Sequence, residues 1–292
     1  MLTSTTIRLR ALAHGELPNT TGRFGHAAFL ALIESVAPEL AHALHDNNGR
    51  QPFTVSPLRV ANHATARPRD SATTRPHDHA TTRPRDHATS VREGDGCSMR
   101  FTILHSTVFQ SFQQALLTTF PAATIHLQNI PFAVEEAITT PHPNLWTGYT
   151  TFEELLERAR DDKIITLRFE SPTAFSLERR DVGKRFELFP VAWNVFDSLA
   201  RKWIEFGDIP IQTDALLEWV QEYVWVSEYA ARTRMLPLER FPQKGFVGTV
   251  TYEVKRGTPD ATRLLNALAD FALYAGVGYK TTMGMGQCRR VQ

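Results

Sequence analysis

The sequence predicts an α+β protein built from two ferredoxin-like domains in tandem. Two observations predict this fold class. Strand-forming and helix-forming patterns follow one another in the order β-α-β, β-α-β, and the same order occurs again in the C-terminal half. The chain has 292 residues, which is long enough for two domains that each have their own core. We place these domains at residues 1–140 and 141–292.

The first half begins with a strand predicted at 6–12, where polar and apolar residues alternate. A helix is predicted at 23–36, because the N-cap residues Thr20 and Thr21 precede a run of helical periodicity. The remaining predicted elements of this half are a helix at 39–45, strands at 53–56, 99–104 and 123–127, and a helix at 107–117.

An octapeptide repeat interrupts this half at residues 60–96. Its three units start at Ala64, Ala72 and Ala80, and each contains a proline and almost nothing apolar larger than alanine. Such a segment cannot bury enough surface to offset the entropy lost on ordering, so we expect a disordered insertion between two strands. Its arginines could hold RNA loosely. We favour the alternative of a tandem duplication that a loop tolerates.

The second half follows a proline-rich joint at 141–144. An aromatic run with helical spacing, Trp193 to Phe206, is expected to belong to its core. The predicted elements are helices at 151–160, 191–206, 214–223 and 259–274, and strands at 163–169, 224–235, 246–254 and 287–291. This split β-α-β order is also that of RNA-recognition motifs.

Composition excludes several classes of protein. No apolar run approaches the roughly 18 residues of a membrane helix, and the first residues lack the pattern of a signal peptide. We therefore expect a cytoplasmic protein without a membrane partner. The only cysteines, Cys97 and Cys288, have no C-x-x-C spacing and no ligand-spaced histidines nearby. Neither a disulfide framework nor a zinc site is expected, and no cofactor is predicted.

Arginine supplies 26 of the 32 basic residues. Its guanidinium group binds phosphate in a bidentate manner and stacks on bases, which favours nucleic acid as a partner, although a high-GC genome would produce the same bias. Arg232 and Arg234 alternate on one predicted strand and should share a face. This face could meet the backbone of an RNA stem, or it could be an ordinary solvated edge.

The last segment is rich in glycine. Four of the sixteen glycines fall within residues 276–286, and no acidic residue follows Asp270. Glycines allow positive φ and close approach of the backbone, so exposed amides, threonine hydroxyls and Lys280 could form a cradle for phosphate. The alternative is a tight turn between the last helix and the last strand.

The C-terminal segment Gly276-Val277-Gly278-Tyr279-Lys280-Thr281-Thr282-Met283-Gly284-Met285-Gly286 resembles the signature glycine loop of the CRISPR-associated endoribonucleases that cut precursor CRISPR RNA within its repeats. The other segments that resemble this family, in order and spacing, are 25–30, 45–58, 171–175, 188–190, 195–199 and 245–248. The resemblance covers nearly the whole chain except 60–96. It implies a metal-independent ribonuclease of two ferredoxin-like domains that leaves a 2′,3′-cyclic phosphate and a 5′-hydroxyl.

The resemblance also implies site residues. His26 matches the catalytic histidine of many bacterial members, and we expect the positive end of its helix to keep it a neutral base. The alternative is that His26 is a partly buried helix residue without a catalytic role. His45 matches a histidine that another branch pairs with a tyrosine and a lysine, but Leu30 and Gln51 occupy those positions here. His45 is therefore predicted as a supporting acid or an RNA contact. The residues expected to bind RNA are Arg23, Arg50, Arg232, Arg234, Lys244, Gly276, Gly278, Tyr279, Lys280, Thr281, Gly284 and Gly286.

These residues suggest three candidate functions. The first is the repeat-specific endoribonuclease, whose implied partners are CRISPR repeat RNA and a CRISPR effector complex that receives the product. The second is a non-catalytic subunit that binds the same RNA. The third is a small-molecule enzyme that holds a nucleotide phosphate, against which the missing G-K-[ST] motif and preceding strand argue. The sequence leaves open whether the protein is a monomer or a homodimer.

Overall fold

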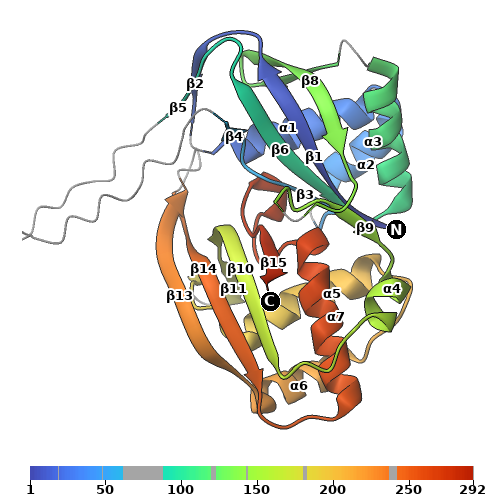
Figure 1. Cartoon of the computed structure of the whole chain (residues 1–292), viewed down its shortest axis with the longest axis vertical. Helices are drawn as coiled ribbons and strands as arrows, with labels where there is room; N and C mark the ends of the chain where they lie inside the picture. The colour runs from blue at the N-terminus through green and yellow to red at the C-terminus, as the bar shows by residue number, and fades with distance from the viewer. Residues whose placement is uncertain are drawn as a thin grey trace, which may run out of the picture.

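The computed structural model describes residues 1–18, 20–47, 49–61, 88–119, 123–142, 144–179, 183–236 and 242–291. The chain forms two halves, each with a β-sheet and helices packed against it, and the halves lie one above the other in Figure 1. No helix within these ranges combines the length and the apolar character needed to cross a membrane.

The first half is built on a sheet whose antiparallel strands run in the order β3-β6-β1-β8-β7, with β4 also paired to β6 and β9 to β1. The seven elements predicted for this half are confirmed, with bounds that differ by a few residues. Its elements are β1 (Leu2–Ala11), β2 (Gly15–Leu17), α1 (Thr21–Glu34), α2 (Pro38–Asp46), β3 (Phe53–Val55), β4 (Arg59–Val60), β5 (Thr89–Val91), β6 (Gly96–Ile103), α3 (Ser106–Thr119), β7 (Thr124–Leu127), β8 (Ile130–Ile138) and β9 (Gly148–Thr150).

Strand β8 was not predicted, although it lies beside the central strand β1. Leu9 pairs with Val134, and the predicted strand at 123–127, which is β7, pairs only with β8 at the edge of the sheet. Pro131 and the adjacent Glu135 and Glu136 interrupt the apolar alternation that marks a half-buried strand, and this hid β8 from the sequence pattern.

The predicted insertion at 60–96 is wrong at its C-terminal end. Residues 89–91 form β5, which pairs with β2, and Val91 is buried in the first core. Gly94 N donates a hydrogen bond to Ala11 O at 2.8 Å, and β6 already begins at Gly96. The apolar side chain of Val91 belongs to the core of the first half. The octapeptide repeats themselves lie outside the described residues.

Helices α1 and α3 pack on the sheet of the first half around stacked aromatic rings. The ring of Phe29 on α1 lies 4.2 Å from Phe53, 5.6 Å from Phe101 and 5.4 Å from Phe112, measured between centroids. All four side chains are essentially inaccessible to solvent. This cluster fixes α1 against β3 and β6 and so fixes the position of every side chain that α1 presents.

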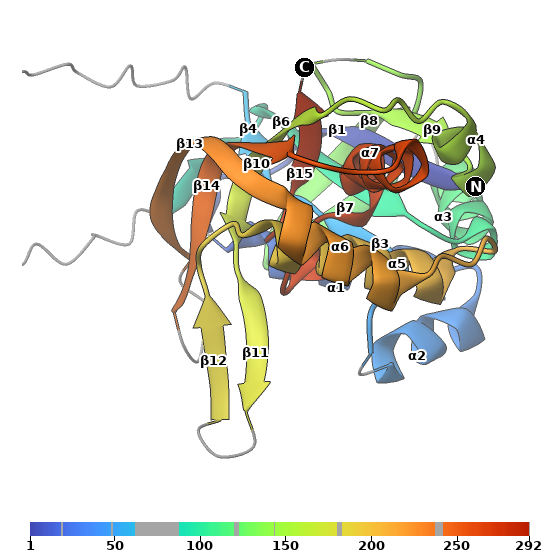
Figure 2. The same cartoon turned by 90° about the horizontal axis from the view of Figure 1, so that it is seen from below.

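The second half contains an antiparallel sheet in the order β13-β14-β10-β15. The eight elements predicted for it are confirmed, and Phe196 and Trp203 are fully buried in its core as expected. The hairpin of β11 and β12 was not predicted and projects from the body of the chain (Figure 2). The elements are α4 (Phe152–Glu157), β10 (Ile164–Thr173), β11 (Phe175–Arg179), β12 (Gly183–Glu187), α5 (Ala192–Phe206), α6 (Thr213–Tyr223), β13 (Val224–Leu236), β14 (Gln243–Val254), α7 (Pro259–Ala275), the short 3₁₀ helix η1 (Thr281–Met283) and β15 (Cys288–Val291).

A buried polar network joins the two halves. The guanidinium of Arg100 on β6 donates hydrogen bonds to the Ser4 hydroxyl and the Leu273 carbonyl, both at 2.9 Å, and to the side chain of Gln287. Gln287 in turn donates to the Val55 carbonyl at 3.2 Å. Burial lowers the pKa of Arg100 to about 9. The end of α7 and the segment before β15 are therefore tied to the sheet of the first half.

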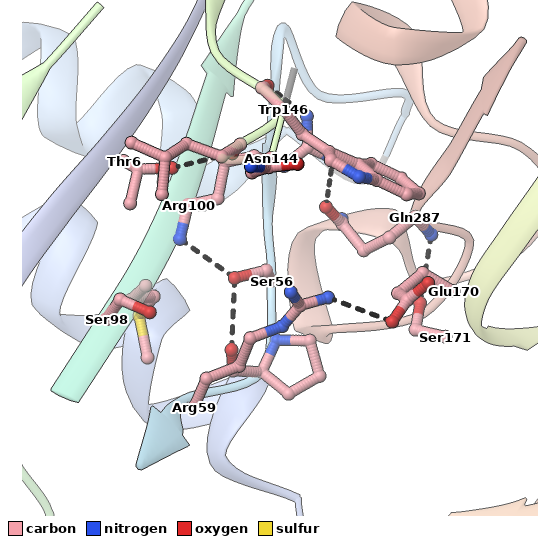
Figure 3. A pocket seen from close by; sticks show the side chains of 13 residues that line it. Thr6, Ser56, Arg59, Ser98, Arg100, Asn144, Trp146, Glu170, Ser171 and Gln287 are labelled. Atoms are coloured by element: carbon pink, nitrogen blue, oxygen red, sulfur yellow. Dashed lines mark hydrogen bonds and ion pairs between the residues drawn. The ribbon is translucent and has the colours of Figure 1, made fainter. Parts of the chain in front are cut away.

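Beside this network lies a cavity of about 240 Å³ between the halves (Figure 3). Arg100 and Trp146 line it, and an ion pair between Arg59 of β4 and Glu170 of β10, 3.2 Å long, crosses from one half to the other. The contacts around the cavity set the relative position of the two halves, on which the site described next depends.

Candidate functional site

His26 lies on α1, which presents its apolar side to the sheet. The buried residues Gly25, Ala28, Phe29, Leu32 and Ile33 recur at helical spacing and define that side. The predicted N-cap at Thr20 makes no side-chain capping bond; instead, the hydroxyl of the next residue accepts a hydrogen bond from Leu58 N at 2.8 Å. The start of α1 is thus fastened to the segment that follows β3.

The imidazole of His26 is partly buried between two other elements. Its ring stacks on Phe53 at 5.4 Å between centroids, and it makes a hydrogen bond with the backbone at Thr282. Its Nδ1 is buried and has no hydrogen-bond partner among the described residues. Burial and, second, the nearby His45 lower the pKa of His26, while the bond at Thr282 acts in the opposite direction.

The lowered pKa of His26 agrees with the sequence prediction, but its expected cause does not. We predicted that the positive end of the helix would disfavour the imidazolium form. Helix α1 begins at Thr21, so His26 is its sixth residue and lies in the second turn. The effect of the helix dipole falls off within the first turn. Burial and the charge of His45 are the causes that the structure supplies.

His45 lies in the last turn of α2 and is exposed, yet it is close enough to influence His26 electrostatically. Gln51, at the position where the other branch has a lysine, donates its side-chain amide to the carbonyls of Leu44 and Asn47 at 3.0 and 2.7 Å. It therefore caps the end of α2 and holds His45 in place. Leu30, at the tyrosine position, packs against the first core.

The glycine-rich loop, residues 276–286, joins α7 to β15 as predicted. Its four glycines all have positive φ, from 61° at Gly276 to 91° at Gly284. Most of its amides are used inside the protein, because Gly278 N donates to the Ser198 hydroxyl, Tyr279 N to Ala174 O and Gly286 N to Pro172 O, at 2.8 to 3.0 Å. The loop is thus a packed turn, and the phosphate cradle predicted for it has fewer amides available than its glycine content suggested.

The glycine-rich loop packs directly on the first turn of α1. A Cβ atom on Gly22 would lie 2.5 Å from Gly284 N and from the carbonyl carbon of Met283. Gly284 also lies against Pro57, which follows β3. The missing side chain at residue 22 lets two segments more than 250 residues apart in the chain form one surface, with His26 one turn away.

Tyr279 and Lys280 lie at the outer part of the loop. The Tyr279 ring is 5.3 Å from Phe186 of β12, and the Lys280 ammonium is 5.4 Å from the Tyr279 ring centroid. Met285 of the loop packs with Leu236 at the end of β13. The loop therefore brings together α1, β12 and the end of β13.

The other predicted RNA contacts are distributed around this centre. The guanidinium of Arg23 lies 4.4 Å above the Phe24 ring, and that of Arg50 is paired with Glu205 at 3.1 Å. Arg232 and Arg234 are exposed and share one face of β13, as predicted. Lys244 pairs in register with Met235 and so points to the opposite face. The structure does not bring Lys244 together with the two arginines.

Two side chains that hold the loop through hydrogen bonds were not predicted from the sequence. Ser198 and Lys202 lie one turn apart on α5, and both make hydrogen bonds to the loop. Lys202 falls seven residues after Val195 and three after Leu199, so its position on the apolar side of the predicted helix was the available signal. Among the described residues, no three His, Cys, Asp or Glu side chains are grouped so as to hold a metal ion.

The chain is similar to known proteins over both halves. A family model described as the CRISPR Cas6 N-terminal domain matches residues 1–157, and one described as CRISPR-associated endoribonuclease Cas6 matches residues 167–288. A CRISPR-associated endoribonuclease Cas6 from Streptococcus thermophilus is 26% identical over 186 residues, which cover 63% of this chain and 72% of that protein.

Solved structures agree with this similarity. A Thermus thermophilus Cas6 product complex superposes with a TM-score of 0.80 at 25% identity and covers 100% of both chains. A second Cas6 product complex gives a TM-score of 0.71 at 27% identity, covering 100% of this chain and 99% of that one. A Cas6 substrate mimic complex gives 0.66 at 25% identity, with 99% of each chain covered.

Proposed function

The chain belongs to the CRISPR-associated endoribonuclease Cas6 family, and we propose that it cleaves precursor CRISPR RNA within its repeats without a metal ion. The attacking group is the 2′-hydroxyl of the RNA itself. The products are a 2′,3′-cyclic phosphate and a 5′-hydroxyl, and they serve as guide RNAs for antiviral defence. The structures named above as product and substrate mimic complexes support RNA as the ligand.

Each half has the ferredoxin-like topology in this proposal. The strand orders β8-β1-β6-β3 and β15-β10-β14-β13 support it, because both place the last strand of a β-α-β-β-α-β unit beside the first. Since Gly148–Thr150 pairs with β1, we move the proposed end of the first domain from residue 140 to the segment that follows Thr150.

The surroundings of His26 carry the mechanistic part of the proposal. An imidazole with a lowered pKa is neutral near pH 7, and a neutral imidazole can accept a proton. In the proposed step, His26 takes the proton of the 2′-hydroxyl while the 2′-oxygen attacks the adjacent phosphorus. The bond from phosphorus to the 5′-oxygen breaks, and the departing oxygen receives a proton.

His45 is the proposed donor of that second proton. It is exposed at the end of α2, and it lies close enough to His26 to lower the pKa of that residue electrostatically. The positive charges of Lys280 and Arg23 would offset the charge that develops on the phosphorane. Arg232 and Arg234, exposed on one face of β13, would hold the RNA backbone.

Incubation of the protein with its repeat RNA in EDTA tests this function. We expect cleavage in EDTA, a cyclic phosphate at the new end, and no cleavage when the nucleotide before the cut carries a 2′-deoxy sugar. Cleavage of the deoxy substrate would contradict the mechanism. Loss of cleavage of the unmodified RNA in EDTA would contradict it as well. Tight binding without any cleavage would show instead a non-catalytic RNA-binding subunit.

A further inference from the structure

Lys202 is a buried ammonium group that the proposed chemistry does not use. Only 5% of the residue is accessible to solvent, because it lies on the buried side of α5. No carboxylate forms an ion pair with it among the described residues. A buried, unpaired amine is costly unless its hydrogen bonds serve a purpose, which makes its contacts informative.

Lys202 makes one hydrogen bond just before the glycine-rich loop and one within it. Its Nζ donates to the carbonyl of Ala275, the last residue of α7, and to the hydroxyl of Thr281 at 3.0 Å. These two acceptors stand at the start of the loop and at the first residue of η1. The side-chain nitrogen of Lys202 therefore links the end of α7 to η1 through two hydrogen bonds.

The hydrogen bond from Lys202 to Thr281 lies one residue from the segment that contacts His26. Thr282, which follows Thr281 in η1, meets His26 through its backbone. The charged groups that act on Lys202 are Arg50, from the segment after α2, and Glu205, on the same helix as Lys202. Glu205 is paired with Arg50 at 3.1 Å and forms no ion pair with the amine, while the charge of Arg50 disfavours the protonated amine.

We propose that Lys202 is a positioning residue for RNA cleavage, which holds η1 through Ala275 and Thr281 so that the backbone at Thr282 keeps His26 in its reactive orientation. The proposal rests on the proposed function, since it assigns His26 to the reaction. Lys202 itself does not touch the RNA: the loop covers it. Loss of its amine should then slow the chemical step and leave RNA affinity nearly unchanged.

Single-turnover cleavage at saturating repeat RNA is the first measurement. We expect Lys202→Met, which keeps the volume but not the donors, to lower the rate about 10- to 100-fold, as a shift near 1 Å at a reacting group does. The dissociation constant for RNA should change by less than about threefold. Lys163→Met, at an exposed residue, is the matched control and should cleave like the wild type.

Thr281→Val is the second variant, because it removes the other end of the bond without a change of volume. In a double-mutant cycle, Thr281→Val should cost little in the Lys202→Met background, since the bond is already gone. Hydrogen exchange of segment 276–287 should be faster in Lys202→Met than in Lys163→Met. This exchange reports on the loop without any need for cleavage.

The outcomes are distinct. Unchanged loop exchange, fully additive rate losses, or a wild-type rate in Lys202→Met would each overturn the positioning role while the proposed function stands. If Lys202→Met does not fold, a wild-type rate in Thr281→Val overturns it equally. Absence of cleavage by the wild type overturns the proposed function, and the positioning role falls with it.

Discussion

Replacement of Gly22 by alanine tests the packing of the glycine-rich loop on α1. The added Cβ would lie 2.5 Å from Gly284 N, whereas ordinary contacts begin at 3.4 Å. The atoms it would meet are backbone atoms of Met283 and Gly284, which cannot rotate away as a side chain can. The loop backbone would have to move by about 1 Å, and Thr282, which meets His26, would move with it.

Two energies of opposite sign act on the stability of Gly22→Ala. Alanine is favoured over glycine in a helix by up to about 1 kcal/mol, while overpacking costs about 1–3 kcal/mol. We therefore expect a net loss of about 1 kcal/mol in the free energy of unfolding, measured by urea denaturation. The single-turnover cleavage rate should fall much further, by about 10- to 100-fold, because it depends on the position of a reacting group.

Gly96→Ala is the matched control, since its Cβ would lie 3.7 Å from the Cβ of Ala61, an ordinary contact. Both substitutions restrict the unfolded chain equally, so a loss of cleavage that occurs only in Gly22→Ala reports on the overlap at the loop. If Gly22→Ala and Gly96→Ala cleaved repeat RNA at the same rate, the reasoning that the loop must dock on α1 for cleavage would be refuted.

Two further predictions concern charge. Burial lowers the pKa of Lys202 from 10.5 to about 7, so between these pH values the unfolded chain binds more protons and the free energy of unfolding should rise with pH, by at most about 1.4 kcal/mol per unit. Urea unfolding at pH 7 to 9 should show that Lys202→Met loses this rise; an equal rise in both proteins would contradict the lowered pKa of the Lys202 amine. Lys280→Ala should weaken RNA binding about 3- to 10-fold and reduce the slope of log K against log salt concentration by about one. Its free energy of unfolding should stay unchanged. Unchanged affinity across salt titrations would leave the loop with a purely structural role.

The order of elements could be predicted from the sequence because most strands and helices carry clear apolar periodicity. Strand β8 could not, since Pro131 and two glutamates break its pattern and its pairing with β1 and β7 makes it a strand. The end of the predicted insertion failed for a similar reason: Val91 is a single apolar residue whose place in the core depends on distant segments.

The candidate site shows the same division between local and distant information. The glycine cluster indicated unusual backbone conformations, and all four glycines have positive φ. Whether the loop amides face a ligand or the protein depends on acceptors at Pro172, Ala174 and Ser198, which no local pattern places beside them. The environment of His26 likewise arises from Phe53, His45 and Thr282, and therefore from the fold.

Single-turnover cleavage of repeat RNA by His26→Ala tests whether His26 is the general base. General-base catalysis contributes about 10²- to 10⁴-fold, so the rate should fall by that factor while RNA affinity stays near that of the wild type. His126→Ala, an exposed histidine on β7, is the matched control and should retain the wild-type rate. Cleavage by His26→Ala at the rate of His126→Ala would show that His26 takes no part in the reaction.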